Sequence, residues 1–480
     1  MCGIVAYLGK KKALPILLEG LKRLEYRGYD SAGLAIANGK LRVWKSEGRI
    51  TRLEEKVAKE NLSATTGIAH TRWATHGAPN ETNAHPHCDQ SGRIAVVHNG
   101  IIENYQTIRA FLEKKGIVFA SETDSEVLAQ LIGHLYKGDL EEAVRAALKE
   151  TKGTYGIAVI SSEEPDRIVA ACNGSPLVLG IGEGEFLIAS DAGAIVQHTT
   201  QVVRLGDGEV AVLDREGFRT TTLDAKPIEK EIADVEYSLE EIELGGFEHY
   251  MAKEIFEQPK CLEDSLRGRM RLDDGKIVLG GLAQLSREIV RARRIILTGC
   301  GSAWHACLVG EYLLEELARI PVEVEYASEL RYRNPIVEEG AVVIAVSQSG
   351  ETADTLAAVR EVRDKGAMVL GIVNSVGSAI PKETDAGVYL HVGPEIGVAS
   401  TKAYTGQLLV FTLLALYLGR RKNLSEATLI DYLGALSKIP DQIQQTLKLS
   451  DSIRDAAKDL VSHENWLFLG RGFNYPTALE

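Results

Sequence analysis

Cys2 stands directly after Met1 and before Gly3. Removal of Met1 would leave a thiol and a free α-amine on the same residue. An α-amine titrates near about pH 7.7 to 8.0, so a fraction is unprotonated at neutral pH and can take a proton from a thiol or from water, as in N-terminal threonine nucleophiles. Cys2 could therefore be nucleophile and base at once. Alternatively, it is an ordinary small residue near a chain end.

Asn99 and Gly100 could complement such a nucleophile. An amide carbonyl attacked by a thiolate becomes a tetrahedral oxyanion, which needs preorganised hydrogen-bond donors. An asparagine side chain and a glycine N–H supply two. Taken alone, however, Asn-Gly is also a favoured hairpin turn, so both interpretations remain open.

Arg72 and Asp124 are the candidates for holding an amino-acid substrate. The substrate's carboxylate calls for a guanidinium and its ammonium for an acidic partner. As single residues, an arginine is more often a surface residue, and Asp124 could instead cap the helix that follows it.

The stretch from Ser347 to Thr352 combines hydroxyls with a glycine, between an apolar strand and a helix. Free N–H groups and the helix dipole make such a turn an anion site that would suit a sugar phosphate. A simple capped helix start is the alternative. Similar turns at 299–302 and 395–402 favour binding.

The first 240 residues contain short β-rich runs with glycine punctuation, which favours stacked, largely antiparallel sheets. Helices are expected over 13–24 and 123–134. The expected strands are 4–8, 34–37, 67–70, 94–98, 155–161, 167–171, 186–190 and 209–213.

From about residue 280 the pattern changes to apolar strand, glycine turn and amphipathic helix. Strands are expected over 294–298, 341–347 and 368–373, with helices reaching 318 and 365. This alternation is typical of a parallel sheet with helices on both faces. The acidic segment 240–259 between the two patterns predicts a domain boundary near 240.

Residues 466–472 repeat the strand and G-x-G turn of 295–302. A second copy of the α/β domain is expected to begin at about 460. Because one strand cannot bury a core alone, the sequence predicts an incomplete copy, or a last segment that docks elsewhere.

Composition narrows the functional classes. The 480 residues are 45% hydrophobic and 25% charged, which is typical of a globular protein of several domains. With no long apolar run and no signal peptide, we expect a cytoplasmic protein without membrane contact. A net charge of −13 disfavours nucleic acid, and six dispersed cysteines favour neither disulfides nor a metal site.

The N-terminal motifs resemble the class II glutamine amidotransferase domain of the N-terminal-nucleophile class. They are MCGIV, EYRGYDSAG, GIAHTRWATHG, NAHPH, VHNGIIEN and SETDSE, in order. The resemblance implies a four-layer αββα fold in which Cys2 attacks the glutamine amide and Asn99 and Gly100 hold the oxyanion. It implies that Arg72, His76 and Asp124 grip the amino-acid end and that Trp73 guards the route of released ammonia.

The second half resembles the sugar isomerase (SIS) domain, through ASELRYR, SQSGETADTL and EIGVASTK. Together, the halves are similar to the isomerising glutamine–fructose-6-phosphate aminotransferases, which make glucosamine 6-phosphate for hexosamine synthesis. The implied sugar-phosphate contacts come from Ser302, Ser347, Gln348, Ser349, Thr352, Val398 and Ser400. The resemblance implies glutamine and fructose 6-phosphate as substrates, no metal or other cofactor, and a homodimer.

The expected domains are the amidotransferase domain over 1–240, a linker and connecting helix over 241–284, a first SIS domain over 285–425, a helical connection over 426–460 and the start of a second SIS domain over 461–480. Ala303 departs from the family's serine. The family's sugar chemistry also uses a glutamate, a histidine and a lysine beyond residue 480. If the chain ends there, glutamine hydrolysis is expected to survive and aminosugar synthesis to be lost.

Three alternative functions compete with this interpretation. An amidotransferase of nucleotide synthesis would carry a phosphoribosyl-pyrophosphate loop, and a sugar-phosphate sensor would carry a DNA-binding helix-turn-helix; neither motif is found in the sequence. A glutaminase without transfer activity remains the third alternative.

Overall fold

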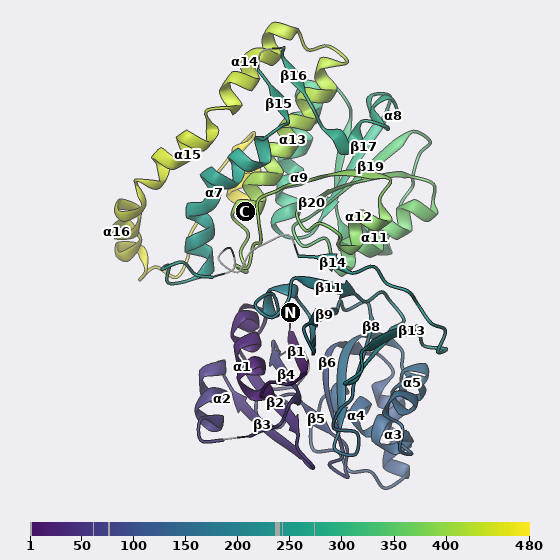
Figure 1. Ribbon diagram of the computed structural model, residues 1–480. Helices are drawn as coiled ribbons and strands as arrows, with labels where there is room; N and C mark the ends of the chain where they lie inside the picture. Colours follow the sequence, from purple (N-terminus) through teal and green to yellow (C-terminus); the bar gives the residue numbers. More distant parts are fainter. Residues whose placement is uncertain (1, 61, 75–76, 236–240, 242, 273) are drawn as a thin grey trace. The chain divides into compact units, whose positions relative to one another are not determined.

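The structure is a computed structural model that describes residues 2–60, 62–74, 77–235, 241, 243–272 and 274–480 (Figure 1). The chain divides into two compact units, residues 1–239 and 240–480. They are called unit 1 and unit 2 below.

Unit 1 contains two antiparallel sheets, as the short β-rich runs predicted. The eight-stranded sheet has the order β14-β11-β9-β10-β1-β4-β2-β3, and the six-stranded sheet has the order β13-β12-β8-β7-β6-β5. In chain order the strands are β1 (Gly3–Leu8), β2 (Ser31–Ala37), β3 (Leu41–Glu47), β4 (Thr66–Arg72), β5 (His87–Cys88), β6 (Ile94–Ile102), β7 (Gly153–Ser161), β8 (Ile168–Asn173), β9 (Val178–Gly182), β10 (Glu185–Ala189), β11 (Gln201–Arg204), β12 (Glu209–Leu213), β13 (Phe218–Thr222) and β14 (Ala233–Asp234).

The two faces of β1 show how unit 1 is layered. Ile4 and Ala6 pack with residues of the six-stranded sheet, such as Ile160. Their neighbours Val5 and Tyr7 face the opposite way, into the cluster that includes the α1 side chains. Because successive residues of a strand point to opposite faces, one core lies between the sheets and another lies under the helices.

Helices cover the outer face of each sheet. Helix α1 (Ala13–Leu24) and helix α2 (Ile50–Val57) share a core with the eight-stranded sheet. Helices α3 (Tyr105–Lys114), α4 (Asp124–Leu135) and α5 (Leu140–Glu150) share one with the six-stranded sheet. The predicted helix 13–24 is confirmed to the residue, whereas α2, α3 and α5 were missed.

Unit 2 is built on a five-stranded parallel sheet of order β18-β17-β19-β20-β21. Its core clusters lie on both faces, with α9 and α13 on one and α10, α11 and α12 on the other. This confirms the predicted parallel sheet between helices. The elements are β17 (Arg294–Gly299), α9 (Ser302–Leu313) continuing as a π-helix (Leu314–Ala318), β18 (Val322–Tyr326), α10 (Ala327–Tyr332), β19 (Ala341–Ser347), α11 (Ala353–Asp364), β20 (Met368–Val373), α12 (Ala379–Glu383), β21 (Ala386–Tyr389) and α13 (Lys402–Arg420).

The flanking segments of unit 2 are mainly helical. Helix α7 (Tyr250–Leu266) packs into the core that contains α9 and α13. It is followed by the short hairpin β15 (Met270–Arg271) and β16 (Lys276–Ile277), and by α8 (Ser286–Val290). After α13 come α14 (Glu426–Leu436), α15 (Ile439–Leu447), α16 (Ser450–Leu460) and α17 (Asn474–Leu479).

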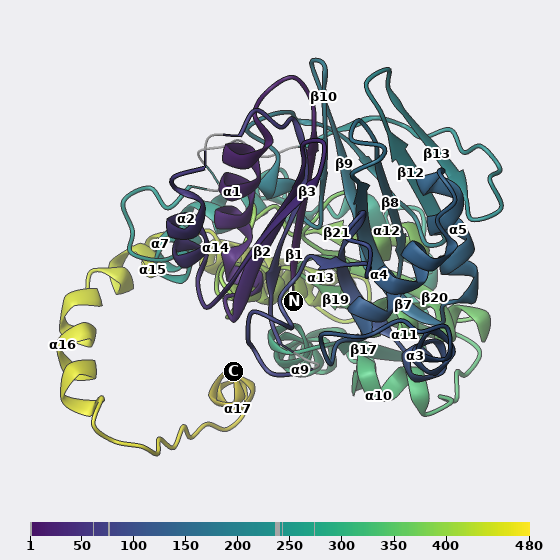
Figure 2. The ribbon, with the colours of Figure 1, turned by 90° about the horizontal axis from the view of Figure 1, so that it is seen from below.

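The strand expected over 466–469 is not formed. These four residues are exposed and have no strand assignment, and none of the described strands pairs with them. Helix α17 instead packs beside α9 (Figure 2).

In the described part of the chain, no helix has the combination of length and apolar character needed to cross a bilayer.

Candidate functional site

Cys2 immediately precedes β1, whose edges pair with β4 and β10. The N–H of Trp73 donates to Cys2 Sγ at 3.3 Å, and the thiol lies 3.6 Å from the Trp73 carbonyl. Burial raises the pKa of the Cys2 thiol, and the hydrogen bond from the Trp73 backbone opposes this shift. The thiol is therefore mostly protonated at neutral pH and needs a base before it can attack.

Asn99 and Gly100 lie inside β6, opposite Gly156 and Tyr155 of β7. The hairpin interpretation is therefore wrong, because the strand continues to Ile102. Asn99 Nδ2 donates to the Cys2 carbonyl at 3.1 Å, so its amide lies beside Cys2.

Gly100 has a φ of 129°, and a Cβ there would lie 2.2 Å from the Thr154 carbonyl oxygen. Only glycine fits this backbone. The structure thus has a specific need for glycine next to the Asn99 amide.

Arg72 ends β4 and is 4% exposed. Its guanidinium donates to the carbonyls of Ala78 at 3.2 Å and Gly77 at 3.4 Å. Burial lowers the pKa of Arg72, and the charges of Cys2 and Asp124 oppose that shift. A guanidinium near the thiol and a carboxylate is the charge arrangement that an amino-acid substrate requires.

Asp124 is buried at the first turn of α4 but does not cap it. The cap is Thr123, whose hydroxyl accepts from Glu126 N at 3.2 Å. The Asp124 carboxylate accepts from Ile102 N at 2.8 Å, in the strand that carries Asn99. The capping interpretation is wrong because the preceding threonine takes that role.

Trp73 is 37% exposed, and its ring meets that of Tyr29 edge-on at 5.5 Å. The next residue, Ala74, donates its N–H to Asp30 Oδ2 at 2.8 Å. Asp30 thus fixes the backbone next to Trp73 through this hydrogen bond. The sequence had not indicated this role. His76 lies outside the described residues.

Sequence reasoning also gave no role to four buried histidines, namely His70, His85, His87 and His98. His70 lies on β4, His87 on β5 and His98 on β6, and His85 lies just before β5. Burial lowers the pKa of each of the four. Their close spacing along the chain was the only feature of the sequence that could have indicated a histidine cluster.

The turn from Ser347 to Thr352 joins β19 to α11 in unit 2. Ser347 Oγ accepts from Gly350 N at 3.0 Å and lies 3.1 Å from Thr352 Oγ1. Gly350 has a φ of 65°, and a Cβ there would lie 1.9 Å from Ser378 Oγ. The turn is therefore compact and gathers hydroxyl groups at the start of α11.

Ser349 and Gln348 complete this turn. The Ser349 hydroxyl accepts from Glu351 N at 3.2 Å, and the Gln348 carbonyl accepts from Ser375 N at 3.2 Å. The Gln348 side chain is half-buried. Donors at a helix start suit an anion.

Ser302 lies at the same edge of the parallel sheet as Ser347, because it follows β17, the neighbour of β19. Its hydroxyl donates to Glu480 Oε1 at 2.5 Å, and Glu480 Oε2 lies 2.6 Å from His305 Nδ1.

Val398 and Ser400 lie in the loop between β21 and α13. Val398 is exposed, and the Ser400 hydroxyl donates to Glu395 Oε2 at 2.8 Å. Glu254 of α7 supports this loop by accepting from Ile396 N at 2.5 Å and Gly397 N at 3.0 Å. Glu254 is a further residue that sequence reasoning missed.

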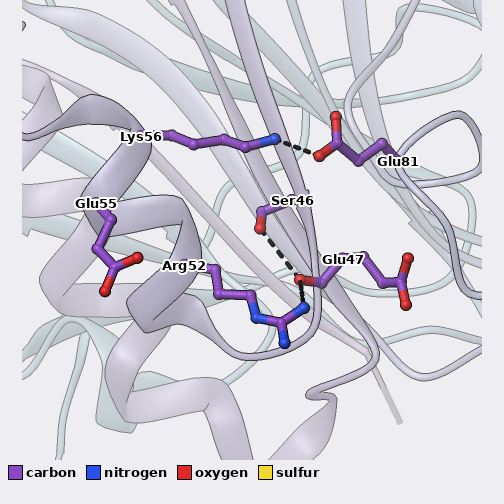
Figure 3. Close-up of a pocket in the computed structure, with 6 residues that line it drawn as sticks. All are labelled: Ser46, Glu47, Arg52, Glu55, Lys56 and Glu81. Carbon is purple, nitrogen blue, oxygen red and sulfur yellow. Dashed lines mark hydrogen bonds and ion pairs between the residues drawn. The ribbon is translucent and has the colours of Figure 1, made fainter.

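A surface hollow of about 530 Å³ lies beside α2 and β3, away from the predicted residues (Figure 3). The Lys56 ammonium pairs with Glu81, and Arg52 donates to the Glu47 carbonyl. Its cations are thus already engaged, and we assign it no function. It is lined by Ser46, Glu47, Arg52, Glu55, Lys56 and Glu81.

The described residues contain no group of three or more histidine, cysteine or acidic side chains placed to hold a metal ion. All six cysteines are free thiols.

Two family models match the chain. Residues 70–197 match the glutamine amidotransferase domain and residues 288–417 match the SIS domain. A solved structure, the C-terminal domain of glucosamine-fructose-6-phosphate aminotransferase from Francisella tularensis, is 34% identical over 49% of this chain and 66% of that chain, with a TM-score of 0.47.

Curated relatives match from end to end of this chain. The glutamine–fructose-6-phosphate aminotransferase (isomerizing) of Chlorobaculum tepidum is 53% identical over all of this chain and 79% of the relative. That of Bacteroides thetaiotaomicron is 51% identical over the same shares. This chain therefore belongs to the family of isomerising glutamine–fructose-6-phosphate aminotransferases.

Proposed function

We propose that this protein transfers the amide nitrogen of glutamine to fructose 6-phosphate, giving glucosamine 6-phosphate and glutamate. The observation that carries the proposal is the placement of the Asn99 amide beside Cys2, in a chain whose full length matches aminotransferases of this specificity. The match favours transfer over the glutaminase-only and sensor alternatives.

In unit 1, the Cys2 thiol attacks the side-chain carbonyl carbon of glutamine. The α-amine of Cys2, freed by removal of Met1, accepts the thiol proton and later delivers it to the departing nitrogen. Donors from Asn99 Nδ2 and Gly100 N stabilise the oxyanion. Its collapse breaks the C–N bond and releases ammonia, and water then cleaves the glutamyl thioester to glutamate.

The α-carboxylate and α-ammonium of glutamine are held by opposite charges. Arg72 pairs with the carboxylate, and Asp124 accepts from the ammonium, with His76 as a further contact. The burial of both charged groups supports these roles, because pairing is stronger away from water. Trp73, half-exposed beside the thiol, guards the route of ammonia.

In unit 2, the turn after β19 holds the sugar phosphate. Ser347, Ser349 and Thr352 supply hydroxyls and Gln348 supplies an amide at the start of α11. Ser302 contributes from the start of α9, after the neighbouring strand β17, and Val398 and Ser400 contribute from the loop before α13. Ala303, in place of the family's serine, removes one hydroxyl from this set.

Four finer features also remain proposals. The two sheets with helices outside support a four-layer αββα fold for unit 1. The domain limits near 240, 285, 425 and 460, the homodimer and the cytoplasmic location rest on the sequence.

The test is to incubate the purified chain with glutamine, with and without fructose 6-phosphate, and to quantify both products. Glutamate and glucosamine 6-phosphate in equal amounts are expected with both substrates present. Glutamate alone would contradict the transfer and leave a glutaminase.

Glu254 offers a separate test of the sugar site. Replacement by alanine removes the acceptor of two backbone N–H groups in the loop that carries Val398 and Ser400. Each unpaired donor costs about 1–3 kcal/mol, so we expect the KM for fructose 6-phosphate to rise about tenfold or more. Initial-rate kinetics of glucosamine 6-phosphate formation measure this.

The matched control is Glu263→Ala, because Glu263 is exposed on the same helix. It should leave both activities unchanged. In Glu254→Ala, glutamine hydrolysis measured without sugar should stay within about twofold of the original. An unchanged sugar KM would show that Glu254 does not support the loop.

A further inference from the structure

His70 reaches from one sheet of unit 1 to the other. On β4 it follows the alternation of Ile68, which points into the core between the sheets. On β6, Asn99 follows Val97 into the same core. His70 Nε2 lies 2.9 Å from Asn99 Oδ1, so the two sheets meet through these side chains.

The hydrogen on the His70 ring is placed by a second contact. Nε2 is also 3.1 Å from the His98 main-chain carbonyl oxygen. A carbonyl oxygen only accepts, so Nε2 must carry the hydrogen and donate. The backbone of β6 thereby selects the ring tautomer.

That tautomer selects the orientation of the Asn99 amide. Because Nε2 donates, the amide atom facing it must be the oxygen, and the NH₂ group then faces Cys2 O at 3.1 Å. A flipped amide would place two donors together at one end and two acceptors at the other. Both contacts would be lost, and buried polar groups would be left unpaired.

The ring is also held neutral and in place. Its plane stacks on His85, with the centroids 4.1 Å apart and an angle of 13°. Nδ1 is buried and has no hydrogen-bond partner among the residues that the structure describes, so a proton there would meet no acceptor among them. Burial lowers the pKa of His70 to about 3, which agrees with this geometry.

We propose that His70 is a positioning residue that sets the Asn99 amide with its NH₂ group toward Cys2, ready for the oxyanion. The proposal rests on the proposed amide-cleaving function of unit 1. A donor already oriented before the oxyanion forms costs no reorganisation during the reaction, and one such donor accounts for about 10²- to 10³-fold in kcat.

Two substitutions separate positioning from packing. In His70→Gln the amide nitrogen can occupy the place of Nε2, whereas in His70→Asn the same group is one methylene too short. We expect kcat for glutamine hydrolysis to fall about 10²-fold in His70→Asn, with KM within about threefold. His70→Gln should recover to within about tenfold of the original.

The affinity of an analogue of the tetrahedral intermediate should depend on the orientation of the Asn99 amide. A purely structural role of His70 would leave that affinity unchanged. Glutamate γ-semialdehyde adds to the thiol and forms an oxyanion, so its affinity should fall by the same factor as kcat/KM in His70→Asn. Glutamate itself should bind unchanged. An unchanged aldehyde affinity, or a loss confined to KM, would overturn the proposal.

A double-mutant cycle tests the route of the effect. If His70 acts through Asn99, the variant carrying both His70→Asn and Asn99→Ala should be no slower than Asn99→Ala alone. Additive losses would overturn the proposal.

Two further measurements distinguish failure of this proposal from misfolding of the variants and from failure of the proposed function. Neutron diffraction of the unsubstituted protein should show the ring hydrogen on Nε2, and a hydrogen on Nδ1 alone would overturn the proposal even if the variants fail to fold. Absence of glutamine hydrolysis in the unsubstituted chain would instead count against the proposed function.

Discussion

Replacing Cys2 with serine should lower kcat for glutamine hydrolysis at least about 10³-fold and abolish glutamine-dependent aminosugar formation. A serine hydroxyl holds its proton far more tightly than a thiol, so the α-amine cannot activate it as readily. The Trp73 N–H that contacts Sγ and the Asn99 amide should remain in place. Glutamine binding, measured by calorimetry, should therefore survive.

Cys88→Ser is the matched control. Cys88 is also a partly buried free thiol of unit 1, on β5, and burial raises its pKa to about 11. No step of the proposed reaction uses it, and its replacement should leave kcat within about twofold. More than a tenth of the original rate in Cys2→Ser would rule out the thiol as nucleophile. Intact-mass measurement should accompany both variants to report whether Met1 is removed.

Local sequence pattern predicted much of the framework of each unit. The helix at 13–24 and the strands 209–213, 341–347 and 368–373 have the predicted limits. Each combines an apolar periodicity with clear flanking turns. The helices α3 and α5 were missed, although both have a buried apolar stripe.

The residues at the site were predictable by type but not by surroundings. Asn99-Gly100 has the local signature of a hairpin, yet β7 pairs with β6 beyond this point as far as Gly153. That partner lies some fifty residues away, so no window around Asn99 reveals it. Similarly, the helix cap could be assigned to Thr123 rather than Asp124 only once the hydrogen bonds were known.

The buried histidines depend still more on tertiary structure. His70 is enclosed because two sheets from distant parts of the chain close over it, and its sequence neighbours do not indicate that. Burial of an imidazole is nevertheless what changes its titration. The consequence should be measurable as a dependence of stability on pH.

Unit 1 should lose about 4 kcal/mol or more of stability between pH 7 and pH 5.5. The folded protein holds His70, His85 and His87 neutral over this range, because burial lowers the pKa of each well below its ordinary value, and burial also lowers the pKa of His98. In the unfolded chain they titrate near about 6.5. Below that pH the unfolded state binds more protons, so the stability they supply is complete above about 6.5 and is lost as the pH falls.

The charges around the cluster act in both directions. Lys45 and Arg72 lower the pKa of His87 further, while Asp124 opposes the shift at His98. By pH 5.5 each of His70, His85 and His87 costs about 1.3 kcal/mol relative to pH 7, and this pH window lies above the range in which ordinary carboxylates titrate. The loss of stability in this pH range therefore comes mainly from protonation of the histidines in the unfolded state.

Hydrogen exchange at a series of pH values would measure this loss in each unit separately. After correction for the intrinsic exchange rate, the opening free energy of β4 and β6 should fall by about 4 kcal/mol or more, while that of β17 and β19 should change little. Unit 2 has no buried histidine among its described residues.

His87→Gln should reduce the pH slope of unit 1 by about one proton, because it removes one group that must stay neutral. His134→Gln is the matched control, since His134 is exposed on α4, and it should leave the slope unchanged. Equal slopes in the two units would show that the buried cluster accepts protons without unfolding. The imidazoles would then not be held neutral, and the fixed tautomer at His70 would lose its physical basis.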